Sequence, residues 1–254
     1  MLIADSDSTT KTVSVGQQCE LALMGRDGVW RTEVPKAIPT NTLELTGASR
    51  ADLAVRCSGD ADITVDNDVV ANVFVDGPAG SAAAHPYAAD GVSTWLSNRP
   101  DYLRDLRNES VANNETVNMG ARTINGSKFD KNVPTFTLDT TGVQEWKLKG
   151  ARNHPFHLHI YHVQVQGDCG DYEDGEYYDV VASNCTLRFD TGAQTSSPYE
   201  GRTILHCHIL EHEDQGAMGW ADVIGGTPAP SYPAGFGYQE YIASPMATGP
   251  ISHH

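Results

Sequence analysis

The sequence lacks features that several protein classes require. It has no basic excess, because 17 Lys and Arg stand against 33 Asp and Glu, and a net charge of −16 argues against a nucleic-acid-binding protein. No apolar run approaches the ~18 residues of a membrane-spanning helix. Residues 1–5 show neither the basic region nor the apolar stretch of a secretory signal peptide. We therefore expect either an intracellular protein or a chain that lacks its true beginning.

Helix signals are scarce as well, and apolar and polar residues alternate instead. In the first part of the chain this alternation occurs at 12–15, 19–23, 52–56 and 62–65. Gly, Pro, Asn and Asp separate these segments, which is typical of short strands joined by turns. The sequence therefore predicts an all-β sandwich or barrel rather than an α/β fold.

The strand signals fall into two blocks. We expect a first block at 1–76, a linker at 77–116, a second block at 117–226 and an irregular, proline-containing tail at 227–254. Strands are predicted in the second block at 135–138, 143–148, 159–166, 186–189, 203–206 and 220–224. A short helix is compatible with residues 95–106, because Pro100 can occupy a first helical turn.

Cysteine and sequon usage bears on the compartment. The five cysteines are Cys19, Cys57, Cys169, Cys185 and Cys207. The simplest arrangement is two disulfides, Cys19–Cys57 and Cys169–Cys185, although three pairings of these four cysteines are open. Asn-x-Ser/Thr sequons occur at Asn108, Asn114, Asn125 and Asn184. Together with the acidic charge, these features favour a secreted glycoprotein over a cytosolic protein with free, buried thiols.

Seven of the ten histidines fall in two short clusters. The first cluster reads His154-Pro-Phe-His157-Leu-His159, with His162 just beyond, and the second reads His206-Cys207-His208-Ile-Leu-Glu-His212-Glu213. The remaining histidines, His85, His253 and His254, are expected at the surface. A single histidine is more often structural than ligating, but such clustering points to metal binding.

Strand geometry explains the spacing within each cluster. Residues two apart in a strand project from the same face, so His157 and His159 project together, as do His206 and His208. Cys207, between the last two, projects from the opposite face. One strand can therefore hold a thiolate-bound metal on one side and an imidazole-bound metal on the other. The Cys207 backbone would then be a short path for an electron between them.

Ligand softness narrows the choice of metal. Two imidazoles and one thiolate with a weak axial position define a blue-copper electron-transfer site, and Cys207, His212 and His154 fit those roles. Zinc is the rival, because it also binds Cys and His. A structural zinc site usually has four protein ligands in one compact site, and these often include pairs of closely spaced cysteines. One cysteine among seven histidines therefore favours copper.

These two clusters resemble the C-terminal copper signatures of the multicopper oxidases, a family that includes laccases, bilirubin oxidases and ferroxidases. The resemblance implies cupredoxin-like Greek-key β-sandwiches. Residues 117–226 would be a complete C-terminal domain and residues 1–76 part of a preceding, middle domain. It also implies a copper-dependent oxidoreductase that couples one-electron oxidation of phenolic, bilirubin-like or metal-ion substrates to the reduction of dioxygen to water.

The resemblance also assigns a role to each motif residue. Type 1 copper would be bound by His154, Cys207 and His212, type 2 copper by His157, and the type 3 pair by His159, His206 and His208. Glu213 matches a carboxylate that would relay protons to oxygen. The axial position of the family falls on Ala217, which cannot ligate, so Met218 is the only nearby thioether. The copper would be three-coordinate, with a raised potential, unless Met218 binds weakly.

A second departure concerns the oxygen-reducing cluster. A complete cluster in this family takes eight histidines, half of them from two His-x-His motifs in an N-terminal domain. Before residue 154 this chain has a single histidine, His85. We therefore expect a portion of a three-domain oxidase that lacks its N-terminal partner domain. The alternatives are a non-enzymatic type 1 copper protein and a zinc-stabilised extracellular binding domain.

Overall fold

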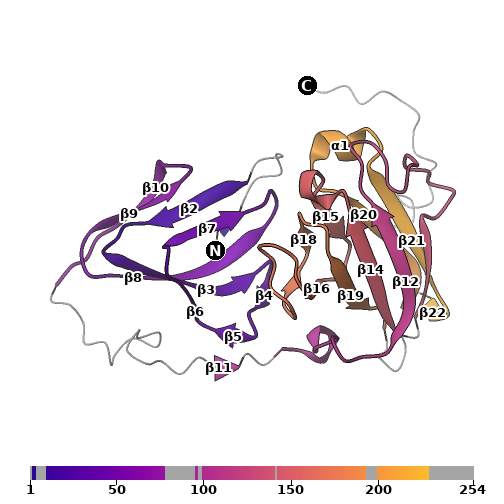
Figure 1. Cartoon of the computed structure of the whole chain (residues 1–254), viewed down its shortest axis with the longest axis horizontal. Coiled ribbons are helices and arrows are strands. Elements are labelled where there is room, and N and C mark those ends of the chain that lie inside the picture. Colours follow the sequence, from indigo (N-terminus) through magenta and orange to yellow (C-terminus); the bar gives the residue numbers. More distant parts are fainter. Residues whose placement is uncertain are drawn as a thin grey trace, which may run out of the picture.

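The protein forms two β-sheet blocks that lie side by side (Figure 1). The computed structural model describes residues 2–3, 10–77, 95–96, 99–140, 142–192 and 199–228. The surface histidines expected at His85, His253 and His254 lie outside the described residues. So do much of the first half of the expected linker and nearly all of the expected tail.

The first block consists of two main sheets. One has the order β1-β8-β3-β4, with β6 also on β3: Leu2–Ile3, Arg50–Cys57, Cys19–Arg26, Val29–Trp30 and Lys36–Ile38. The other has the order β10-β9-β2-β7: Asp68–Val73, Ala61–Val65, Lys11–Val15 and Thr42–Leu45. A small ladder joins β5 (Glu33–Val34) to β11 (Trp95–Leu96). All of these pairings are antiparallel.

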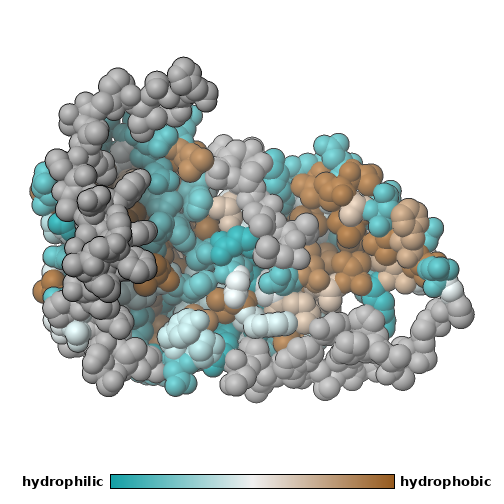
Figure 2. All heavy atoms as spheres, turned by 180° about the vertical axis from the view of Figure 1, so that it is seen from behind, coloured by the Kyte–Doolittle hydropathy of each residue, from teal (hydrophilic) through white to brown (hydrophobic). Residues whose placement is uncertain are grey.

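A small apolar core and one disulfide hold the first block together. Its central buried side chains include Val13, Leu23 and Leu45. The disulfide Cys19–Cys57 joins the directly paired residues of β3 and β8, which confirms the expected pairing. From behind, apolar side chains gather over this block, whereas the second block shows a largely hydrophilic surface (Figure 2).

The second block is a sandwich of two larger sheets. The first has the order β12-β14-β19-β16-β17: Val111–Asn118, Val143–Lys149, Thr186–Asp190, Val163–Gln166 and Tyr177–Tyr178. The second has the order β13-β21-β20-β15-β18, with β22 also on β20: Phe136–Asp139, Met218–Ile224, Tyr199–Cys207, Phe156–Leu158, Val180–Val181 and Thr227–Pro228. The pairs β12–β14 and β13–β21 are parallel.

Aromatic packing dominates the core of the second block. Trp146 is fully buried, and its ring lies 4.7 Å from that of Phe136, 5.0 Å from Phe189 and 6.1 Å from Phe156, between centroids. Phe156 belongs to the strand that carries His157. The core therefore fixes β15, the strand that carries His157.

The observed elements contain most of the predicted strands, but several differ. The predicted strand at 159–166 is wrong over its first half, because β15 ends at Leu158 and β16 begins at Val163, so His159 follows β15 instead of lying on it. Short strands such as β4, β10 and β18 were not predicted. The expected short helix is a single 3-10 turn, Asp101–Leu103, which Pro100 precedes. Strand β12 begins at Val111, inside the expected linker. A short helix, α1 (Leu210–Asp214), follows β20. Among the described residues, no helix has the length and apolarity needed to cross a bilayer.

We expect Trp146→Ala to lower the free energy of unfolding by about 3–5 kcal/mol, because truncating a fully buried indole leaves a cavity. The measurement is urea unfolding of the metal-free chain followed by circular dichroism. Trp30→Ala is the matched control, since that side chain is 53% exposed and should change stability by less than about 0.5 kcal/mol. Equal losses in the two variants would contradict this account of the core.

Candidate metal centre

Two neighbouring strands bring the histidine clusters together. Strands β15 and β20 pair antiparallel, with Phe156 opposite Cys207 and His157 opposite His206. Directly opposed residues on antiparallel strands project from the same face of a sheet. His157 and His206 therefore share one face, and Cys207 shares the other with Phe156. This is the alternation that the His-Cys-His spacing predicts.

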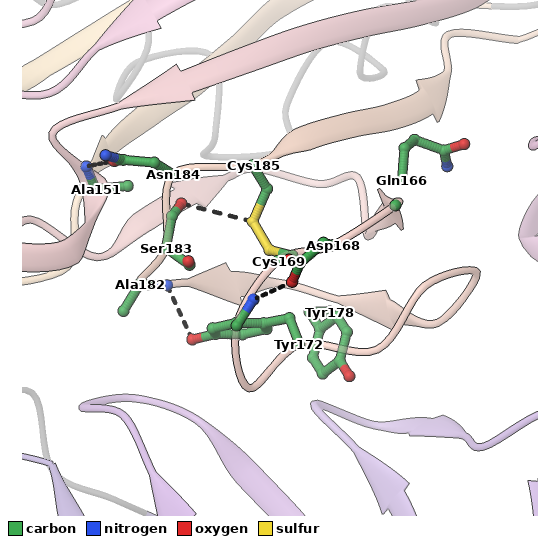
Figure 3. The surroundings of a disulfide bond; sticks show 12 residues. Ala151, Gln166, Asp168, Cys169, Tyr172, Tyr178, Ala182, Ser183, Asn184 and Cys185 are labelled. Carbon is green, nitrogen blue, oxygen red and sulfur yellow. Dashed lines mark hydrogen bonds between the residues drawn. A yellow bond between two sulfur atoms is a disulfide. The ribbon is translucent and has the colours of Figure 1, made fainter.

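A short turn and a short helix supply two further histidines on the Cys207 side. His154 follows the 3-10 turn Ala151–Asn153, which begins after Gly150 at φ 73°. A Cβ at that position would clash with the carbonyl oxygen of Met119. The Ala151 N–H donates to Asn184 Oδ1, beside the disulfide Cys169–Cys185 (Figure 3). This disulfide confirms the second expected pairing.

The first group of potential ligands contains Cys207, His154 and His212. The Nδ1 atoms of the two histidines are 3.1 Å apart, and Cys207 Sγ lies 3.7 Å from His212 Nδ1 and 4.0 Å from His154 Nδ1. His212 comes from α1, which starts three residues after Cys207. The sulfur is fully buried and the imidazoles are half-buried. The structure thus brings together all three expected type 1 ligands.

The second group lies on the opposite face and contains His157, His159 and His206. Their ligand atoms all lie within 4.8 Å of one another, and His159 Nε2 is 3.2 Å from His206 Nε2. The ring of His208 is 5.1 Å from that of His206 and 5.3 Å from that of His157, between centroids. His208 therefore borders this group without entering its tight triangle.

Hydrogen bonds fix which nitrogen of two of these rings can bind a metal. His157 Nδ1 lies 2.6 Å from the carbonyl oxygen of Asp179, and His206 Nδ1 lies 3.0 Å from that of Cys207. A carbonyl oxygen only accepts, so each Nδ1 carries the hydrogen and each Nε2 keeps its lone pair. His208 Nδ1 is buried and has no hydrogen-bond partner among the described residues.

Burial keeps the imidazoles neutral. Desolvation is the main cause that lowers the pKa of His157 and of His206 to about 4, and neighbouring histidines lower it further. Desolvation also lowers the pKa of His154 and His159. Conversely, burial raises the pKa of the Cys207 thiol to about 11. At neutral pH these four imidazoles are therefore ready to bind a metal, whereas the thiol must lose a proton when it does so.

Donor type and separation both fit copper. An ion about 2.0–2.1 Å from an imidazole nitrogen and about 2.3 Å from a thiolate sulfur leaves roughly 3–4 Å between its donor atoms. The measured separations of 3.1, 3.7 and 4.0 Å match that range. One thiolate with two imidazoles is the donor set of a blue-copper site. The all-imidazole group and the unpartnered His208 Nδ1 are likewise suited to a transition metal.

The register of β20 and β21 bears on the axial position. Met218 lies opposite His206, so its side chain projects from the His206 face and away from the Cys207 face. Ala217 is fully buried, and its carbonyl oxygen accepts the Cys207 N–H at 2.9 Å. The side chain of Met218 is therefore not placed to join the group of Cys207, His154 and His212.

Glu213 and His162 lie in different surroundings. Glu213 Oε2 is 3.0 Å from His206 Nδ1, and burial raises the pKa of this carboxyl group. His162 Nε2 donates to the carbonyl oxygen of Asp27, so His162 lies between the two blocks and not in either cluster. The segment between Cys169 and Cys185 is rich in acidic residues, and two of them form ion pairs: Glu173 with Arg31 and Lys36, and Glu176 with Arg99.

Sequence reasoning missed the carbonyl of Asp179 as the partner of His157. A backbone acceptor has no side-chain signature, and Asp179 is 22 residues from His157 in the chain. No motif could have revealed this contact. Only the pairing of β15 with β18 brings the two residues together.

Comparisons of sequence identify relatives of the second block. A family model described as multicopper oxidase matches residues 98–225, just over half of the chain. A multicopper oxidase of Staphylococcus haemolyticus is 29% identical over 137 residues, covering 50% of this chain and 28% of that protein. A laccase of Haloferax volcanii is 32% identical over 103 residues, covering 38% and 18%. The matched region thus spans less than a third of either relative.

Comparisons of structure extend over both blocks. A multicopper oxidase from Pseudomonas thermotolerans aligns with a TM-score of 0.64 and 20% identity, covering 85% of this chain and 52% of that one. A laccase from Pediococcus acidilactici aligns with a TM-score of 0.61 and 18% identity, covering 85% and 47%. These alignments confirm the expected all-β, cupredoxin-like fold.

We expect the metal-free chain to lose stability as the pH falls from about 6.5 to about 4. The folded-state pKa of His157 and His206 is about 4, whereas an unfolded histidine titrates near 6.5. In that window the unfolded chain binds more protons, which costs up to roughly 3 kcal/mol for each group. Urea midpoints measured with a chelator at pH 7 and at about pH 4.5 test this.

The matched variants for this pH dependence are His206→Gln and Trp30→Ala. The first removes one shifted imidazole and should reduce the stability lost on acidification. The second changes an exposed side chain that does not titrate, so it should leave that loss unchanged. The raised pKa values of Asp27 and Glu213 act in the opposite direction, so the comparison is made between variants. An identical loss in wild type and His206→Gln would refute the assignment.

Proposed function

Because this chain belongs to the multicopper oxidase family, we propose that it accepts single electrons at a type 1 copper and delivers them to an oxygen-reducing copper cluster. The observation that supports this most directly is the placement of Cys207. Its sulfur lies among two imidazole nitrogens on one face of β20, and the preceding residue, His206, belongs to the histidine group on the other face.

Cys207 connects the two centres by two routes. Its backbone continues directly into His206, and its carbonyl oxygen also accepts a hydrogen bond from His206 Nδ1 at 3.0 Å. Both routes lie within β20, the strand that contains His206 and Cys207. When bound, copper supplies the one-electron redox chemistry and the affinity for dioxygen. The residues of this chain would hold the metal ions on the two faces of β20, and burial excludes water from the Cys207 sulfur.

Glu213 is suited to hold and release a proton beside the histidine cluster. Its Oε2 contacts His206 Nδ1, and its raised pKa brings protonation closer to neutral pH. Reducing dioxygen to water consumes protons, so a carboxyl group next to the cluster has a use there. The same contact helps to keep the hydrogen of His206 on Nδ1.

The electron donor would reach the half-buried side of the first group. His154 and His212 are partly accessible, and Leu210, which also belongs to α1, is 53% exposed. Partly accessible imidazoles suit electron transfer from a small phenolic or pyrrolic reductant or from a metal ion at the surface. With Ala217 in place of a thioether, we expect a raised reduction potential at this copper.

The chain offers only part of the histidines that the resemblance implies for the cluster. Those available are His157, His159, His206 and His208, and no His-x-His motif precedes residue 154. We propose that a partner domain bearing the remaining histidines completes the oxygen-reducing site.

That the protein is secreted and glycosylated stays a prediction. All four sequon asparagines are exposed.

Addition of Cu(II) to the full chain should produce the intense visible band of a copper–thiolate charge transfer. Cys207→Ser should abolish this band and lower the copper bound by one equivalent, because the hydroxyl cannot replace the soft sulfur ligand. His162→Gln, a histidine outside both groups, should leave the band unchanged. A colourless wild-type chain that contains copper would contradict the type 1 assignment.

The copper-loaded chain alone should consume oxygen with a phenolic dye no faster than Cys207→Ser. The reason is that only half of the implied cluster histidines are present. An oxygen electrode gives the rate directly, and metal analysis gives the copper content. Turnover well above the Cys207→Ser background would show that this chain completes the cluster by itself. A blue chain that does not consume oxygen fits both an incomplete oxidase and an electron carrier. Addition of the partner domain distinguishes them, because it should restore oxygen uptake only if the chain is part of an oxidase.

A further inference from the structure

We propose that the first block positions His157, through a buried network of Asp27, Arg50 and Asp179 that fixes the hydrogen of its imidazole on Nδ1. In this interpretation these three residues are positioning residues for a ligand of the oxygen-reducing cluster, and the proposal rests on the function proposed above. The first block then contributes to the metal centre although it provides none of the ligands identified in it.

The network reaches His157 through one carbonyl group. His157 Nδ1 lies 2.6 Å from the carbonyl oxygen of Asp179. Asp179 immediately precedes β18, and β18 pairs with β15 so that Val180 lies opposite His157. The position of the Asp179 carbonyl therefore depends on how the start of β18 is held.

The other polar groups of Asp179 are held by the first block. Its N–H donates to Asp27 Oδ2 at 3.1 Å. Its carboxylate accepts two hydrogen bonds from Arg50, at 2.8 Å to Oδ1 and 2.5 Å to Oδ2. A bidentate guanidinium–carboxylate pair fixes direction as well as distance. The backbone N–H and the side chain of Asp179 are thus anchored across the interface, which leaves its carbonyl for His157.

Asp27, which holds the backbone of Asp179, is itself held by burial and by several hydrogen bonds. Asp27 is fully buried and occupies a left-handed conformation (φ 53°) in the turn between β3 and β4. Its Oδ1 accepts the Arg50 N–H at 2.9 Å, and its carbonyl oxygen accepts both Arg50 Nη2 at 3.0 Å and His162 Nε2 at 2.9 Å. Every oxygen of Asp27 is therefore hydrogen-bonded to a neighbour that belongs to the same interface.

His206 offers an internal contrast. Its Nδ1 is bonded to the carbonyl oxygen of the next residue, Cys207, and to Glu213, both in the second block. Loss of the interface network should therefore release the His157 ring and leave the His206 ring unchanged. A general loosening of the protein would affect both rings.

The experiment reads the two tautomers in the full, metal-free chain by long-range proton–nitrogen NMR of ¹⁵N-histidine. In wild type, both His157 and His206 should show the Nδ1–H form alone. In Arg50→Gln and Asp179→Asn, His157 should shift to a mixture in which Nε2–H is populated, while His206 stays Nδ1–H. Arg50→Lys, which keeps the charge and part of the hydrogen bonding, should retain most of the wild-type state.

Arg56→Gln is the matched control, because Arg56 lies on the same strand, pairs with Glu20 at 2.6 Å and is equally exposed (30% against 29% for Arg50). It should leave both tautomers unchanged. Copper titration gives a second readout: Arg50→Gln should weaken binding at the histidine group by about 10- to 100-fold and leave the copper–thiolate band unaltered.

A pure Nδ1–H signal from His157 in both Arg50→Gln and Asp179→Asn would overturn the proposal, and so would an equal change in Arg56→Gln or at His206. Failure of the proposed function is a separate result, since it would appear as a missing copper–thiolate band in wild type. The tautomers are measured without metal, so the two outcomes do not depend on one another.

Discussion

The pairing of β15 with β20 is the constraint on which both metal groups depend. Because side chains alternate with a period of two, the register that sets His157 opposite His206 also sends Cys207 to the other face. A slip of one residue would move the sulfur into the histidine group and the imidazoles into the aromatic core. The fully buried Trp146 and Phe156 oppose such a slip, since their packing fixes the apolar face of the strand.

Burial then decides the chemical state of the ligands. The imidazoles of His157 and His206 are neutral because they are desolvated, and the Cys207 thiol stays protonated for the same reason. A metal cation would suit both kinds of group, because it can bind the lone pairs of the neutral imidazoles and can displace the proton of the thiol. Burial likewise raises the pKa of Glu213, so this carboxyl group would be suited to hold a proton in the role proposed for it.

The sequence was sufficient for whatever depends on local periodicity and motif spacing. It predicted the strands around 19–23 and 143–148, both disulfides, and the separation of Cys207 from His206 onto two faces. It could not predict the start of β12, because the residues from Val111 lack clear alternation and the strand is stabilised by its parallel partner β14. The contact of His157 with a backbone carbonyl was equally out of reach, since carbonyl groups have no sequence signature.

The two metal groups differ in what holds them. The Cys207 group is anchored within the second block: by the turn at Gly150, by the loop that Cys169–Cys185 closes, and by α1. The histidine group instead borders the first block, whose Asp27 and Arg50 hold the segment next to His157. The geometry of the first group therefore depends on contacts within the second block, whereas that of the second group also depends on contacts with the first block. If a partner domain completes the histidine group, as proposed above, its histidines must meet His157 in a fixed position. The contact of Asp179 with the first block would hold His157 in that position.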